Sequence, residues 1–260
     1  MLPPAFAGVE SYLWVLLVAA IRPGAAFFAA PLFGQAMVPV QLRFVIAVAI
    51  GMAGYAAVPF QLPPDGITSF AGIGLVMGEV MAGLALGFAV QIGFSAAMLA
   101  GETISNAMGL GFAAMMDPST GNSSQAVGTL LSMLGSFLFL SIGGHLTLAT
   151  IIVESYRSLP VGGPSLSNDA IHGLVMFGGD MIAAGFAIAL PVGFALMIVQ
   201  VVMGILSRSA PAFNLFVVGM PVTLLSGLIL LAIAAPAIGE GITNAIERGL
   251  DEAHQIAIGH

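Results

Sequence analysis

Residues 78–124 read GEVMAGLALGFAVQIGFSAAMLAGETISNAMGLGFAAMMDPSTGNSS, and the character of the chain changes near residue 101. Before that point the stretch is almost entirely apolar. After it, apolar residues are interspersed with Gly, Asn and Ser, and the pair Asp117-Pro118 follows. The later part is too apolar for an ordinary loop and too broken for a good spanning helix. The stretch therefore predicts a long apolar helix followed by an irregular apolar segment.

The composition of the whole chain predicts an integral membrane protein. Of its 260 residues, 59% are hydrophobic and only 7% are charged, whereas a soluble domain carries about 25% charged residues. No strand-like alternation is sustained, so the predicted fold class is all-α. The chain has no cysteine, which excludes disulfides and thiolate metal sites. With five basic residues and a net charge of −7, it has no basic face for nucleic acid.

Six apolar segments are predicted, each long enough to cross a hydrocarbon core with roughly 20 residues. Their approximate ranges are 9–30, 40–59, 67–100, 126–153, 171–206 and 213–238, with Pro191 and Pro221 inside the last two. We expect a single membrane domain over residues 1–260. Charged residues after Gly239 predict a short, amphipathic, solvated tail over about 239–260.

Two acidic residues bracket the third apolar segment. Glu79 and Glu102 are 23 positions apart, which is about 35 Å along a continuous helix. The favoured interpretation is that both lie at the membrane interfaces, one at each end of the span. The alternative is that one of them faces a protein interior and pairs with an arginine, because intramembrane acids are costly and usually functional.

Small residues at a spacing of four predict close helix packing. Gly74, Gly78 and Ala82 form one such series, and Gly83 and Gly87 form another. This spacing lets two helix backbones approach each other. We place Gly219, which lies inside the last apolar segment, in the same class of packing residues.

No enzyme motif is present, so we expect no catalytic residues, no cofactor and no metal. The chain lacks the HExxH motif of a metalloprotease and the Gly-x-Ser-x-Gly elbow of a serine hydrolase. His145 and His172 are expected to cap helices or lie at an interface. By composition alone, a proton- or ion-coupled transporter that uses Glu79, Glu102 or Asp180 is the leading alternative.

Two stretches carry a family resemblance. Residues 78–124, quoted above, and residues 190–228, LPVGFALMIVQVVMGILSRSAPAFNLFVVGMPVTLLSGL, both resemble the FliR/SctT family. This family is the R (or T) subunit of the flagellar and virulence type III export gate. Further positions agree with the family pattern: Arg22, Pro31, Gly34, Pro39, Arg43, Gly144-His145 and Leu159-Pro160. The resemblance covers nearly the whole chain and favours the flagellar branch over the virulence (injectisome) branch.

The resemblance implies a set of helical hairpins within a helical, pore-forming hetero-oligomer. The family's partners are the P and Q gate subunits (FliP and FliQ families) and a switch subunit of the FlhB/SctU type. Unfolded flagellar substrates pass through the middle of the complex, which lies in the bacterial inner membrane at the flagellar basal body. Much of the apolar surface would then be buried against sister subunits rather than membrane lipid.

The resemblance also implies that residues 106–122 form a plug loop in the lumen of the closed gate. Irregular backbone is tolerated at membrane depth only where it is buried in protein or lines a cavity. Methionines suit a seal that must reshape, and glycines allow bending. The alternative is a plain connector at the membrane surface. The expected plug residues are Asn106, Met108, Gly109, Gly111, Phe112, Met115, Met116, Asp117 and Pro118.

A second signature, SRSAPAFNLF at residues 207–216, predicts a helix break. Pro211 removes a backbone donor, and Asn214 can satisfy the freed backbone groups where the helix restarts. Arg208 is expected either to anchor the helix at the membrane interface or to form an ion pair. Its candidate partners are Glu102, Asp180 and an acid of a neighbouring gate subunit.

Overall fold

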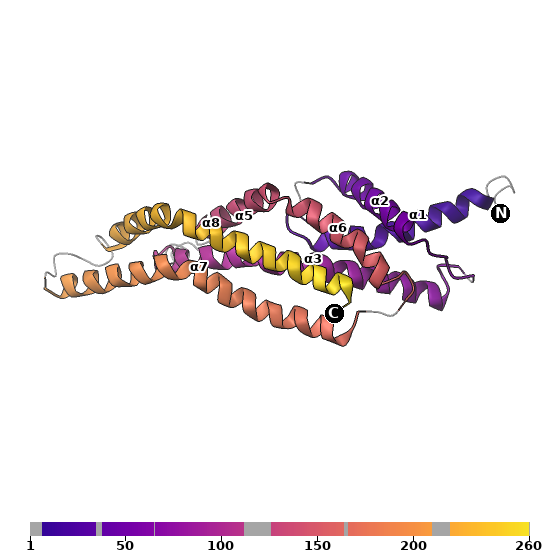
Figure 1. Ribbon diagram of the computed structural model, residues 1–260. Coiled ribbons are helices and arrows are strands. Elements are labelled where there is room, and N and C mark those ends of the chain that lie inside the picture. The colour runs from indigo at the N-terminus through magenta and orange to yellow at the C-terminus, as the bar shows by residue number, and fades with distance from the viewer. Residues whose placement is uncertain are drawn as a thin grey trace. The chain divides into compact units, whose positions relative to one another are not determined.

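The computed structural model describes residues 7–34, 38–64, 66–111, 126–163, 166–209 and 219–259, with side chains from Tyr12 onward, and this part consists of helices joined by short turns and loops. The helices are α1 (Ala7–Ala29), α2 (Val40–Ala57), α3 (Phe70–Ala107), α5 (Ala126–Ser141), α6 (Gly144–Ser158), α7 (Asn168–Ser209) and α8 (Met220–Ile258) (Figure 1). The predicted all-α fold class is confirmed.

Five of the described helices are long and apolar enough to cross a membrane: α1, α2, α3, α7 and α8. Helices α5 and α6 are separated by only two residues and count as a sixth span if taken together. The prediction of about six apolar segments is therefore confirmed. Three helices are longer than one crossing requires, since α3, α7 and α8 have 38, 42 and 39 residues, or about 57–63 Å each at 1.5 Å per residue.

The two prolines that we singled out in the last apolar segments occupy different positions. Pro191 lies inside α7, which continues through it to Ser209. Pro221 is in the first turn of α8, which begins at Met220. A proline there costs no intrahelical hydrogen bond, because the first N–H groups of a helix have no acceptor within it.

The C-terminal residues form the second half of α8 rather than a short solvated tail. The helix runs on to Ile258, and Ala253, Ile256 and Ala257 are buried. The charged residues that suggested a tail, Glu247 and Asp251 among them, lie on the exposed side of the same helix. The stretch is amphipathic, as we expected, but one of its sides is buried in the first unit rather than solvated. Its apolar residues recur at helical spacing and pack inward.

The chain divides into two compact units, each described here by itself. The first unit comprises residues Met1–Gly93, Ile142–Gly178 and Glu247–His260. In it, α1 packs on α2, and α2 packs on α6. The backbones come very close at Gly51, where a Cβ atom would lie 2.3 Å from the carbonyl oxygen of Ala19. Only glycine permits this approach of α2 to α1.

The second unit comprises residues Phe94–Ser141 and Gly179–Ile246. Glycines again permit close contact, since a Cβ on Gly101 of α3 would lie 2.5 Å from the Cα of Gly128 in α5. Likewise, a Cβ on Gly241 of α8 would lie 2.7 Å from Cγ1 of Ile188 in α7. Small residues thus bring the helices of this unit together, as they do in membrane bundles.

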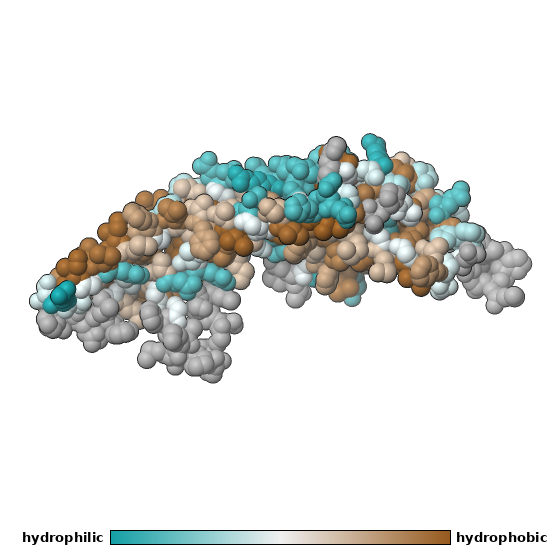
Figure 2. All heavy atoms as spheres, turned by 90° about the horizontal axis from the view of Figure 1, so that it is seen from below, coloured by the Kyte–Doolittle hydropathy of each residue, from teal (hydrophilic) through white to brown (hydrophobic). Residues whose placement is uncertain are grey.

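Large apolar side chains are exposed along most of α7. They occur in its first turn, in its middle and in its last turns, and Figure 2 shows many apolar side chains on the surface of the face that it views. The exposed side chains on α7 are Ile171, Val175, Met176, Ile182, Phe186, Leu190, Phe194, Met197, Ile198, Val201, Val202, Ile205 and Leu206. This surface requires an apolar environment of lipid or protein.

Candidate functional site

A charged residue is buried in the apolar core of the first unit. Arg22 lies on α1 within a run of apolar residues, and only 1% of its surface is exposed. A buried guanidinium is very costly unless its charge is compensated and its donors are occupied. The surroundings of Arg22 therefore decide whether α1 can pack at all.

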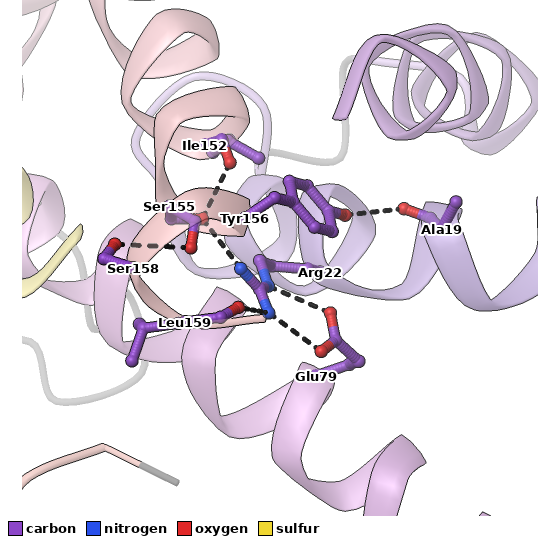
Figure 3. Close-up of polar contacts among 8 residues, drawn as sticks. All are labelled: Ala19, Arg22, Glu79, Ile152, Ser155, Tyr156, Ser158 and Leu159. Atoms are coloured by element: carbon purple, nitrogen blue, oxygen red, sulfur yellow. Dashed lines mark hydrogen bonds and ion pairs between the residues drawn. The ribbon is translucent and has the colours of Figure 1, made fainter. Parts of the chain in front are cut away.

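Glu79 of α3 supplies the compensating charge. Arg22 Nε donates to Glu79 Oε2 at 2.9 Å, and Nη2 donates to Oε1 at 2.8 Å (Figure 3). The two parallel bonds form a bidentate pair, which is the strong and geometrically specific form of this interaction. Glu79 is itself only 2% exposed, so the pair ties α1 to α3 away from water.

The remaining Arg22 contacts reach the end of α6. Nη1 donates to Ser155 Oγ at 3.0 Å, and Nη2 donates to the carbonyl oxygen of Leu159 at 2.7 Å. Leu159 is the C-cap residue of α6, where carbonyl groups lack a helical partner and a positive charge is favourable. Ser155 in turn donates to the carbonyl oxygen of Ile152 at 2.7 Å. Arg22 thus caps α6 while it neutralises Glu79.

Tyr156 completes the network from the next position of α6. The Arg22 Cζ atom lies 4.2 Å from the centre of the Tyr156 ring, in the geometry of a cation–π contact. The Tyr156 hydroxyl donates to the carbonyl oxygen of Ala19 at 2.8 Å. A Cβ on Gly54 of α2 would lie 2.4 Å from Tyr156 Cε2. The ring is therefore held between α1 and α2, so Arg22 and Tyr156 together link α1, α2, α3 and α6.

A cavity of about 590 Å³ lies beside the ion pair. Arg22, Glu79 and small or apolar residues such as Leu62, Gly74, Gly78 and Gly162 line it. The described residues contain no group of His, Asp and Glu that could hold a metal ion. Because the carboxylate and four Arg22 donor bonds are engaged within the network, the arrangement is suited to joining helices rather than to acid–base chemistry.

Glu79 does not occupy the position that we favoured from the sequence. An interfacial end marker would be exposed, whereas Glu79 is buried and paired with an arginine, as the alternative interpretation expected. The sequence did not indicate which arginine, because Arg22 is 57 positions away. The available signal was that Arg22 is a charged residue inside an apolar segment, which is rare without a partner.

The other residues expected to pack or pair differ in their surroundings. Gly83 and Gly87 of α3 lie against α1, since Cβ atoms there would be 2.3 Å from Arg22 O and 2.1 Å from Ala26 O. A Cβ on Gly78 would meet nothing within 4 Å. Gly219 is buried just before α8. Pro211 and Asn214 lie outside the described residues.

Arg208 is exposed at the end of α7, Asp180 is exposed, and Glu102 is half-buried. Within the part of the chain that the structure describes, Arg208 forms no ion pair with Glu102 or Asp180. Its expected pairing within this chain is therefore not found in the described part.

The first residues of the expected plug loop belong to the end of α3. Asn106 is exposed on the last turn, and Met108 is buried with 2% of its surface exposed. Gly109 follows with φ +81°, a backbone conformation that glycine adopts without strain. Gly111 is half-buried. Phe112, Met115, Met116, Asp117 and Pro118 lie outside the described residues.

Comparisons with known proteins give one consistent result. Residues 13–249 match the model of a family described as bacterial export proteins, family 1. The flagellar biosynthetic protein FliR of Escherichia coli K12 is 34% identical over 227 residues, which cover 87% of this chain and 85% of that protein. The protein of the same name from Pectobacterium carotovorum is 31% identical, with 88% and 86% covered. That from Aquifex aeolicus is 28% identical, with 90% of each chain covered.

Proposed function

The chain belongs to the bacterial export proteins of family 1, the family of the flagellar biosynthetic protein FliR, and we propose on this basis that it is a core membrane subunit of the flagellar protein export gate. The observation that carries the proposal is the length of the match, which runs through nearly all the described helices. The named relatives are flagellar proteins, which favours this branch over the virulence branch. A bacterial inner-membrane location in the basal body follows from that role.

Within the gate, we propose that the subunit joins P and Q subunits to form the export channel, next to a switch subunit of the FlhB/SctU type. The exposed apolar surface of α7 supports this. It extends from Ile171 to Leu206, which is about 53 Å along the helix. The hydrocarbon core of a bilayer is about 30 Å thick, and spans tilt by at most about 40°. Measured along the helix, this surface is longer than the hydrocarbon core covers even at that tilt, which supports burial of part of it against a neighbouring protein subunit.

The second part of the proposal concerns closure. We propose that the segment after α3 acts as the plug that closes the lumen until a substrate is exported. Its methionines, glycines and Phe112 suit an apolar seal that changes shape. The role is passive, because the energy for export is expected to come from other parts of the machinery.

Assembly is tested by co-expressing this chain with P and Q subunits and measuring the mass of the intact complex purified through a tag on this chain. We expect one defined hetero-oligomer that contains a single copy of this chain. A stable particle that contains only this chain, with no P or Q subunit, would contradict the proposal. That result would favour the ion-coupled transporter instead.

Closure is tested by deleting residues 110–116 and measuring passive leak of small solutes through the assembled complex in vesicles. We expect the complex to retain its mass while the leak rises above that of the intact complex. A second variant, with Phe112, Met115 and Met116 all replaced by alanine, covers the case in which the deletion prevents assembly. An assembled complex that stays tight in both variants would contradict the plug role.

A further inference from the structure

The end of α3, where the expected plug loop begins, is capped by a complete Schellman motif. Gly109 has φ +81°. Its N–H donates to the carbonyl oxygen of Asn106 at 3.0 Å, and the N–H of Leu110 donates to that of Ser105 at 3.1 Å. This pattern satisfies two of the carbonyl groups that a helix end leaves without partners. The carbonyl groups of Ala107 and Met108 remain.

Side chains of α7 and α8 satisfy both of these carbonyl groups. Gln200 Nε2 of α7 donates to the carbonyl oxygen of Ala107 at 2.6 Å. Thr223 Oγ1 of α8 lies 3.2 Å from the carbonyl oxygen of Met108 and 3.0 Å from that of Met220. Since a hydroxyl has one proton, Thr223 shares it between these two acceptors. Every carbonyl group from Ser105 to Met108 thus has a donor.

The side chain of Met108 is seated on α8 as well. Gly227 lies one helical turn after Thr223, and a Cβ at this position would be 2.6 Å from Met108 Cγ, 2.7 Å from Cε and 2.9 Å from Sδ. The absence of a side chain on residue 227 leaves the space that the Met108 side chain fills. The methionine is consequently 2% exposed.

We propose that Gln200, Thr223 and Gly227 hold the end of α3 as a fixed base for the gate loop. Met108 stays seated on α8 both when the gate is closed and during export. This inference rests on the proposed plug role and refines it, because Met108 and Gly109 become part of the support rather than of the moving seal. Unseating Met108 would expose a large apolar side chain and leave its buried carbonyl group without the Thr223 donor, which is unfavourable.

A cross-link tests whether the base is fixed. The chain has no cysteine, so the double variant Met108→Cys/Gly227→Cys carries a single designed pair. We expect a disulfide to form in the assembled complex, shown by loss of maleimide labelling of this chain, and substrate export to continue under oxidising conditions. Failure to form the disulfide, or export that stops when the pair is oxidised and resumes on reduction, would overturn the proposal.

Substitutions on α8 test whether the base keeps the gate shut. Thr223→Val removes the donor to Met108, and Gly227→Ala places a methyl group where Met108 lies. Losing one such hydrogen bond shifts an equilibrium by about tenfold, so we expect the passive leak to rise by about that factor at unchanged complex yield. Thr223→Ser, which keeps the hydroxyl, and Gly239→Ala, whose Cβ meets nothing within 4 Å, should match the unsubstituted complex.

The two proposals fail in different ways. If the 110–116 deletion leaks but Thr223→Val and Gly227→Ala are tight, the fixed base is wrong and the plug role stands. If the deletion is tight, the plug role is wrong, and the cross-link still decides whether Met108 stays seated during export.

Discussion

Arg22 and Glu79 form a bidentate ion pair across 57 positions of the chain, with both residues almost fully buried. The pair joins α1 to α3, and the same guanidinium caps α6 and lies against Tyr156. A buried pair of this kind need not stabilise a fold more than apolar residues would. It does penalise any packing of α1 that separates the two charges, so it specifies how α1, α3 and α6 meet.

Breaking the ion pair from one side should be more harmful than removing it altogether. Arg22→Met or Glu79→Leu alone leaves one charge buried without a partner, and we expect a loss of about 3–5 kcal/mol in the free energy of unfolding. The double variant should recover most of that loss. Unfolding of the purified subunit by SDS in mixed micelles measures these differences.

Arg157→Ala is the control for this series, because Arg157 lies on α6 next to Tyr156 but is exposed. Its effect should stay within about 0.5 kcal/mol. Single variants as stable as the unsubstituted chain would show that the pair does not control the packing.

Replacing Gly87 or Gly78 of α3 by alanine should change the free energy of unfolding in opposite directions. A methyl group on Gly87 would lie 2.1 Å from the carbonyl oxygen of Ala26, and backbone cannot move aside easily. We expect Gly87→Ala to lower the free energy of unfolding by about 1–3 kcal/mol, as overpacking does. Gly78→Ala has open space within the chain and should gain up to about 1 kcal/mol from helix propensity.

Thermal unfolding of the isolated subunit in detergent compares the two variants. If both behave alike, the close approach of α1 to α3 at Gly87 is not a determinant of stability. Measuring the stability of these two variants in the assembled complex tests whether a partner subunit also packs on α3. A loss with Gly78→Ala only in the complex would indicate that a partner subunit covers this side of α3.

The last turns of α8 should tolerate change on one side only. Ala253 is fully buried, whereas Asp251 is exposed two positions earlier. We expect Ala253→Glu to cost at least about 3 kcal/mol, because it places a charge inside the unit. Asp251→Ala should change stability by no more than about 0.5 kcal/mol.

Limited proteolysis with a tag at the C-terminus reports the effect on α8 directly. Ala253→Glu should speed release of the tag, and Asp251→Ala should not. Equal release from both variants would support a solvated tail after all.

The class of the protein and most of its helices were predictable because they depend on local composition. Runs of about 20 apolar residues specify spanning helices without reference to the rest of the chain. Helix ends were less accurate: the third segment was expected to stop near Ala100, and α3 ends at Ala107. Its polar last turns are stabilised by the neighbouring helices, including the bond that Gln200 donates to Ala107.

The candidate site was predictable only in part, because it depends on contacts between residues that are far apart in the chain. Glu79 could be singled out from the sequence, since an acid in an apolar run is rare, but its burial and its pairing could not be chosen. The spacing of Gly78, Gly83 and Gly87 indicated close packing without indicating which glycines contact another helix of this chain.

The sequence by itself therefore determined an all-α membrane protein with about six apolar segments, because hydropathy and helical periodicity are properties of neighbouring residues. Only the tertiary structure decided that Arg22 is the partner of Glu79, that α8 buries one side of its last turns, and that Met108 sits on Gly227. Each of these depends on residues far apart in the chain whose contacts are chosen by packing and by the need to satisfy buried polar groups.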